Sequence, residues 1–115
     1  MNYIWNSAEG EVEVLSVVDG ETLDVSFRLP FDIAVKRRIR LARVSAPSTK
    51  DKSTREAALL AKQTVTDLLA AAKSVKIVTH KAGRYSFYVA DVFVDGISLN
   101  KLLVEKGVVQ EYKHR

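Results

Sequence analysis

The pattern of hydrophobic and polar residues predicts a chain of short strands with one long helix. Residues 12 to 18 begin with valines alternating with glutamates, and the period breaks after Val14, which predicts a twist or bulge. Residues 23 to 29 alternate throughout and end at Pro30, so they predict a half-buried strand. The dipeptide Asp19-Gly20 lies between these runs and predicts a tight hairpin turn, because glycine adopts a positive φ at no steric cost.

The remaining pattern predicts three more strands and two helices. After a connector over 31 to 34, residues 35 to 44 alternate between an apolar and a basic side. Apolar residues three and four apart predict an amphipathic helix from about 54 to 72, with a capping box formed by Ser53 and Glu56. The later elements are strands over 74 to 80 and 84 to 94, a turn at Asp95-Gly96, and a short helix from Ser98 to about Lys106 that ends at Gly107.

This order of elements predicts a mainly β fold with helices, in the α+β class. Three meandering strands, a helix between strands three and four, two further strands and a short helix after strand five describe a five-stranded OB-fold barrel, partly open. We expect one domain over 1–115, with 1–10 as an entry arm in which Trp5 packs on the domain edge, and 108–115 as a tail. Such barrels bind oligonucleotides and oligosaccharides, although fold alone does not determine function.

The composition and net charge limit the kinds of site and partner that the chain can have. The absence of cysteine excludes disulfides and thiolate ligands, and the distant pair His80 and His114 argues against zinc. A net charge of +4 permits a polyanionic partner without requiring one. No apolar run approaches the ~20 residues of a membrane span, and residues 1–6 do not resemble a signal peptide. We therefore expect a cytoplasmic monomer that has no membrane partner. A mature secreted protein is an open alternative.

Two charged features are candidates for a functional site. Lys36, Arg38 and Arg40 fall on one side of the third predicted strand, which is either a solvated face or a surface for phosphates. The turn at Asp19 and Glu21 brings carboxylates together, and these repel one another unless a cation or solvent screens them. A metal site and a solvated acidic turn are both open interpretations of this turn.

Four motifs in order resemble the staphylococcal nuclease (thermonuclease-like) family. The resemblance spans about residues 11 to 109 and has the same order of elements. It implies an OB fold of that type and the hydrolysis of DNA and RNA phosphodiesters with calcium. The motifs are Val18-Asp19-Gly20-Glu21-Thr22-Leu23, Arg40-Leu41-Ala42-Arg43-Val44-Ser45-Ala46-Pro47, Arg84-Tyr85-Ser86-Phe87-Tyr88-Val89-Ala90, and Asp95-Gly96 through Asn100 with Leu103-Val104 and Gly107.

The family's catalytic set is altered at four positions of this chain. Glu21 replaces an aspartate that binds calcium, which moves the carboxylate by about one methylene, roughly 1.5 Å. Ser45 replaces the second carboxylate ligand, and Ser48 replaces the glutamate that is the proposed general base. A serine is a weak neutral ligand and cannot act as a base near pH 7 without activation. Phe87 stands where the family has its second catalytic arginine.

Other positions keep the family's residue types. Arg40 matches the first catalytic arginine, and Arg84 and Tyr85 match the lysine and tyrosine that contact a terminal phosphate. Each has an alternative role: Arg40 could pair with Asp19 or Glu21, and Arg84 and Tyr85 could be ordinary surface residues near a turn. Phe87 could pack within a strand or stack on bases.

The resemblance and its departures together imply a catalytically impaired or inactive domain of this type. It would bind nucleic acid or nucleotide phosphates weakly through the cations and the tyrosine, and calcium weakly at Glu21 and Asp19. The alternatives are an active calcium-dependent nuclease with an altered site, and a protein-interaction or structural domain. The phosphate-binding residues would be Arg40, Arg84, Tyr85, Lys36 and Arg38.

Overall fold

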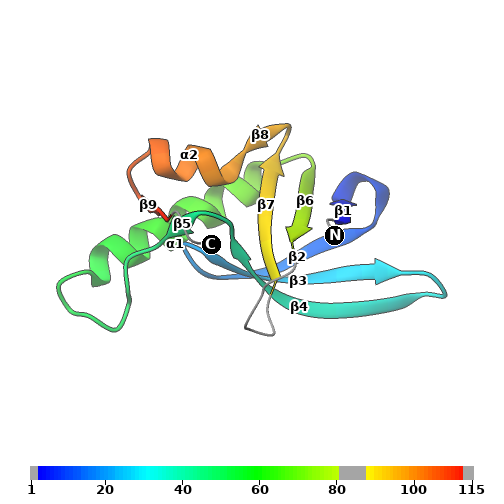
Figure 1. The fold of residues 1–115 in the computed structure, drawn as a ribbon, viewed down its shortest axis with the longest axis horizontal. Helices are drawn as coiled ribbons and strands as arrows, with labels where there is room; N and C mark the ends of the chain where they lie inside the picture. Colours follow the sequence, from blue (N-terminus) through cyan, green and yellow to red (C-terminus); the bar gives the residue numbers. More distant parts are fainter. Residues whose placement is uncertain (1–2, 81–87, 113–115) are drawn as a thin grey trace.

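A computed structural model describes residues 3–80 and 88–112 and contains an open β-sheet with two α-helices (Figure 1). The helical segments are η1 (Ser7–Glu9), α1 (Arg55–Ala71) and α2 (Leu99–Glu105). The strands are β1 (Tyr3–Asn6), β2 (Val12–Asp19), β3 (Thr22–Leu29), β4 (Ile33–Leu41), β5 (Val44–Ser45), β6 (Val75–His80), β7 (Tyr88–Val94), β8 (Ile97–Ser98) and β9 (Gln110–Glu111). Among the residues described, no helix is long and apolar enough to cross a membrane.

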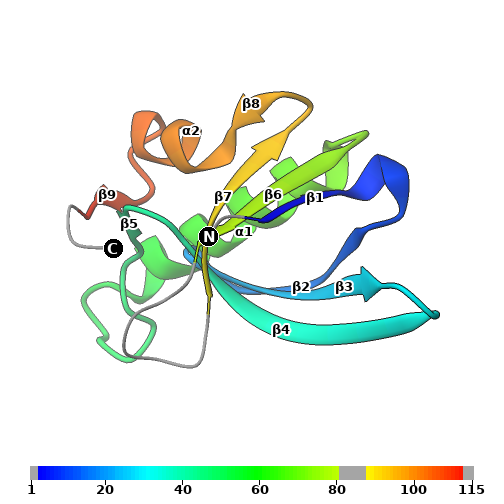
Figure 2. The same ribbon diagram turned by 45° about the vertical axis from the view of Figure 1, so that its right-hand side comes forward.

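The main sheet has the order β1-β6-β7-β4-β3-β2, and β8 pairs with β7. The β4 and β7 strands are parallel, and the other neighbours are antiparallel. The prediction of a mainly β fold with helices is confirmed, whereas the barrel is not: in the described residues the sheet stays open, because its end strands β1 and β2 do not pair. Closure would require β2 to reach the outer edge of β6, and β1 already occupies that edge (Figure 2).

The described part of residues 1–10, the predicted entry arm, contains strand β1 and the short helix η1. Tyr3 lies opposite Thr79, and Asn6 lies opposite Lys76. Trp5 packs at the domain edge, as expected, with its ring centroid 4.6 Å from that of Phe27. Its indole Nε1 also donates to Thr79 Oγ1 at 3.2 Å. The indole hydrogen bond therefore holds Trp5 on β6, and the aromatic contact packs its ring against β3.

The core lies between the sheet and α1. Leu23, Ile39 and Leu41 are fully buried, and Ala61 and Val65 of α1 are buried with them in one cluster. Alternation along β3 and β4 explains this, since these strand residues share one face of the sheet.

The predicted capping box at the start of α1 is wrong. Thr54 is the N-cap residue, and its side chain makes no capping hydrogen bond. The Ser53 hydroxyl instead donates to Asp51 Oδ1 at 2.9 Å, and the Ser53 N–H donates to the same oxygen. These two hydrogen bonds lower the pKa of Asp51. An acidic residue two positions earlier therefore takes the hydroxyl that the capping box needs.

The β3–β4 hairpin projects beyond the rest of the sheet (Figure 1). The predicted connector over 31–34 is wrong at its end, because Ile33 and Ala34 already pair with β3. Phe31 and Asp32 form the tip with φ values of 66° and 61°. The Phe31 side chain is 93% exposed, so it gains no packing that would offset its left-handed backbone.

Replacing Phe31 by asparagine should raise the free energy of unfolding by about 0.5–1 kcal/mol, since asparagine tolerates this backbone region. Phe31→Ala is the matched control, because it removes the ring but keeps an ordinary Cβ at positive φ. Urea unfolding followed by circular dichroism would measure both variants. Equal stability of the two variants would contradict the role of backbone strain.

Candidate functional site

The acidic turn joins β2 to β3, with Asp19 opposite Thr22. Asp19 Oδ1 accepts a hydrogen bond from the Glu21 N–H at 2.8 Å, so the turn itself uses one oxygen of that carboxylate. The predicted break in the period of β2 is confirmed as register shifts between Val14 and Ser16 and between Val17 and Asp19.

Gly20 is required for close packing rather than for a positive φ. The prediction from the hairpin turn is wrong on this point, because Gly20 is not among the residues with positive φ. A Cβ at Gly20 would lie 2.7 Å from Ala61 Cβ and 3.1 Å from Ala46 Cβ. The turn, α1 and the segment after β5 therefore meet at Gly20, which brings the acidic turn beside Ser45 and Ala46.

Gly20→Ala should lower the free energy of unfolding by about 1–3 kcal/mol, because the added methyl overlaps Ala61. Ala61→Gly removes the overlapped atom, so the double variant should be more stable than the two single effects predict by at least about 1 kcal/mol. A double-mutant cycle by urea unfolding measures this coupling. A coupling energy near zero would contradict the contact.

Arg40 lies on the central strand β4, between Thr22 of β3 and Val89 of β7. Its neighbours in sequence, Ile39 and Leu41, are fully buried, so the half-buried Arg40 lies on the opposite face. The Leu41 N–H donates to the Glu21 carbonyl at 2.7 Å, which places the backbone of the acidic turn against the end of β4. The structure thus brings Arg40 and the acidic turn together, as the motifs predict.

The other two cations of this face differ in their partners. Arg38 Nε and Nη2 donate to the two oxygens of Asp24 at 2.8 and 3.2 Å. This pairing lowers the pKa of Asp24 and raises the pKa of Arg38. Lys36 is exposed and lies opposite Ser26, whose side chain is uncharged.

Ser45 and Ser48, for which the family resemblance implies carboxylates, lie in a short segment after β4. Ser45 is half-buried in β5 and pairs with Gln110 of β9, which the sequence indicated only as a further strand-like contact. Ser48 is exposed, and its Oγ accepts from the Lys50 N–H at 3.1 Å. A cleft of about 320 Å³ borders this segment and is lined by Ser45, Ala46, Pro47, Thr54, Gly107, Val108, Val109 and Gln110.

A second polar cluster, which the sequence did not reveal, lies on the same face as Arg40. Asp91 of β7 accepts from Arg43, and its other oxygen is 2.8 Å from His80 Nε2. Val89 lies opposite both Arg40 and His80, which places His80 near the proposed site. The only sequence signal is the alternation of β6 and β7, which puts both residues on the outer face.

Three predicted site residues, Arg84, Tyr85 and Phe87, lie outside the described residues. Within residues 3–80 and 88–112, no group of three or more His, Asp or Glu side chains could hold a metal ion. The family resemblance implies ligands at Asp19, Glu21 and Ser45, and two carboxylates with a neutral hydroxyl are a poorer set for calcium than several carboxylates.

Comparison with protein families matches residues 38–115, more than half of the chain, to the staphylococcal nuclease homologue family. The chain belongs to this family. No curated protein matches it. The matched segment of this staphylococcal nuclease homologue includes Arg40, Ser45 and Ser48, whereas the acidic turn at Asp19 and Glu21 precedes it.

Proposed function

We propose that this staphylococcal nuclease homologue is a catalytically impaired or inactive domain that binds nucleic-acid phosphates weakly on the outer face of β4. One observation supports the proposal: serines, Ser45 and Ser48, stand where the family resemblance implies carboxylates, and Arg40 is present where it implies an arginine. A site that keeps the cation Arg40 but has neutral Ser45 and Ser48 favours binding of an anion over its hydrolysis.

The missing groups account for the loss of catalysis. Without a base at Ser48, no carboxylate at that position activates the attacking water. Each charge-stabilising group that is lost typically costs ~10²–10³ in rate, although such losses do not simply add. Any calcium at Asp19 and Glu21 would be weakly held, because one Asp19 oxygen already accepts from the turn and Ser45 offers no charge.

Phosphate binding would depend mainly on Lys36 and Arg40, with Arg84 and Tyr85 as further contacts implied by the family resemblance. Arg38 is held by Asp24, so a phosphate must compete with that carboxylate for its guanidinium. The Asp24 carboxylate stays ionised at neutral pH, since pairing lowers its pKa. Asp24 therefore limits the affinity of this face.

Fluorescence anisotropy with a labelled single-stranded oligonucleotide at about 50 mM salt tests the binding, since electrostatic contacts are strongest there. Lys36→Gln should weaken binding and reduce the salt slope by about 0.7. Asp24→Asn should strengthen binding, because it frees Arg38. Lys62→Gln, an exposed cation on α1, is the matched control and should change neither. Absence of binding by the parent protein would reject the proposal.

Incubation with denatured DNA, with calcium or with a chelator, tests the loss of activity. The proposal predicts no difference between the two conditions. Cleavage that requires calcium and disappears in Arg40→Ala would instead establish an active nuclease with an altered site.

A further inference from the structure

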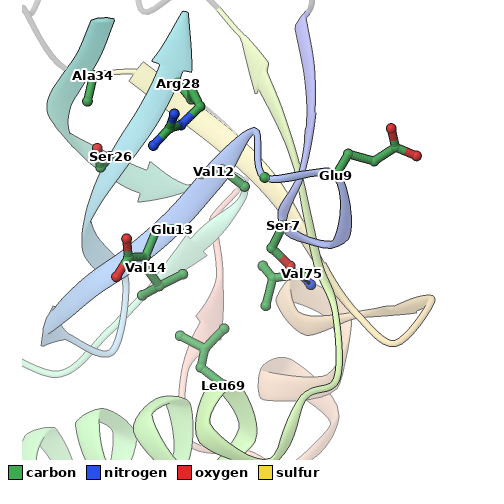
Figure 3. A pocket seen from close by; sticks show the side chains of 11 residues that line it. Ser7, Glu9, Val12, Glu13, Val14, Ser26, Arg28, Ala34, Leu69 and Val75 are labelled. Carbon is green, nitrogen blue, oxygen red and sulfur yellow. Dashed lines mark hydrogen bonds between the residues drawn. The ribbon is translucent and has the colours of Figure 1, made fainter. Parts of the chain in front are cut away.

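The sheet is open between the free edge of β2 and the start of β6, a gap that we call the seam. A cleft of about 770 Å³ lies in the seam, beside the first half of β2. Figure 3 shows Val14 of β2 above Leu69 of α1, with Ser7 and Val75 facing them across the gap. This volume falls within the range of about 300–1,000 Å³ found for ligand sites. The cleft lies at the end of β2 remote from the Asp19 turn, and it borders the outer face of β3, because Ser26, which lies opposite Lys36, also lines it.

The backbone of β2 has unpaired hydrogen-bonding groups along this cleft. The Arg28 N–H donates to the Glu11 carbonyl at 2.9 Å, so Glu11 and Glu13 direct their backbone groups toward β3. The backbone groups of Val12 and Val14 therefore point away from β3, into the seam. In the described part of the chain, no hydrogen bond to these outward groups is present, because β2 pairs only with β3.

The side chains around the seam indicate which peptide would fit. Val14, Leu69 and Val75 provide an apolar floor. The rim has two carboxylates, Glu9 and Glu13, and one guanidinium, Arg28, so acidic groups are in excess there (Figure 3). Two copies of this edge would bring like charges together, which disfavours self-pairing. The register shift at Leu15 ends regular pairing, so the available edge is short.

We propose that the β2 edge at Val12–Val14 binds an extended peptide with alternating basic and apolar residues by strand addition. The peptide backbone would pair with the outward groups of Val12 and Val14. Its apolar side chains would cover the floor, and its lysines or arginines would reach Glu9 and Glu13. The added peptide strand would lie along β2, in the seam that stays open because β1 and not β2 pairs with β6.

A fluorescein-labelled peptide Lys-Val-Lys-Val-Lys-Val, with blocked ends, tests the proposal by anisotropy on the full chain. We expect saturable binding that weakens at least about tenfold when alternate peptide nitrogens are methylated, because methylation removes strand donors. The charge-reversed peptide Glu-Val-Glu-Val-Glu-Val should not bind. Failure of the parent peptide to bind at about 1 mM, or equal binding of the methylated peptide, would overturn the proposal.

Variants of the protein locate the site. Val14→Pro removes an outward N–H without breaking the β3 ladder and should weaken peptide binding about tenfold. Glu13→Gln should weaken it about threefold, and Glu56→Gln on α1 is the matched control with no effect.

Hydrogen exchange of the Val12 and Val14 amides should slow when the peptide binds, which tests the site even if Val14→Pro fails to fold. Unchanged exchange at both amides would reject the peptide site. A dimer seen by sedimentation and dissociated by Val14→Pro would also reject it, because the edge would then pair with a second copy of the chain. Lys36 and Arg40, on which oligonucleotide binding is proposed to depend, are not among the residues that line the cleft, so the two assays can be distinguished.

Discussion

Replacing Asn100 by leucine is expected to lower the free energy of unfolding by about 3 kcal/mol. Asn100 is only 3% exposed, and its Oδ1 accepts from the Val92 N–H at 3.0 Å. Its Nδ2 donates to the Ala42 and Ala90 carbonyls at 2.9 and 3.1 Å. Leucine fills a similar volume but leaves buried backbone groups unsatisfied, each at a cost of about 1–3 kcal/mol.

Urea unfolding followed by circular dichroism measures this loss. Asn100→Asp should be at least as destabilising as the leucine variant, because it places a buried carboxylate oxygen against the Ala42 and Ala90 carbonyls. Lys101→Gln, at the exposed next position of α2, is the control and should be neutral within about 0.5 kcal/mol. A loss of less than about 1 kcal/mol in the leucine variant would show that these bonds contribute little.

The Asn100 bonds also bear on the site, because they join the end of β4 to β7. Ala42 lies two residues after Arg40, and its N–H donates to the Ala90 carbonyl. Through these bonds α2 holds the parallel β4–β7 pair that positions Arg40. We therefore expect destabilising changes at Asn100 to weaken phosphate binding as well, without removing any cation.

Local patterns in the sequence predicted the elements well and their assembly less well. Alternation identified β2, β3 and β4, and the Asp19-Gly20 dipeptide identified their first hairpin, because these signals depend on neighbours in the chain. The arm around Trp5 carries no period of its own. Its strand depends on a free edge of β6 that is distant in sequence, and the same pairing leaves the sheet open.

In the candidate site, too, the sequence predicted some features and not others. The motifs correctly placed the acidic turn beside the end of β4, because the β3–β4 register follows from one short hairpin. They did not predict that Gly20 contacts Ala61, that Asp24 holds Arg38, or that His80 pairs with Asp91. Each of these contacts joins residues from separate elements, and the periodicity of one element carries no information about them.

Restoring the family's residue types should produce the largest gain in activity. We expect the combined variant Glu21→Asp, Ser45→Asp, Ser48→Glu and Phe87→Arg to cleave denatured DNA with calcium at least about 100-fold faster than the parent. The estimate follows from the ~10²–10³ that one charge-stabilising group contributes to the rate. Single restorations should give little, because groups that act as a unit are strongly non-additive.

Two controls separate restored chemistry from other effects. Adding Arg40→Gln to the combined variant should abolish the gain, because that cation would stabilise the charge that develops on the phosphate. Calcium should raise the melting temperature of the combined variant more than that of the parent, since the two introduced aspartates would supply carboxylates in place of the Ser45 hydroxyl and the longer Glu21 side chain. If the variant folds and binds calcium but cleaves no DNA, the substitutions at these four positions are not what limits activity. The cause would then lie in the geometry of the open sheet that carries them.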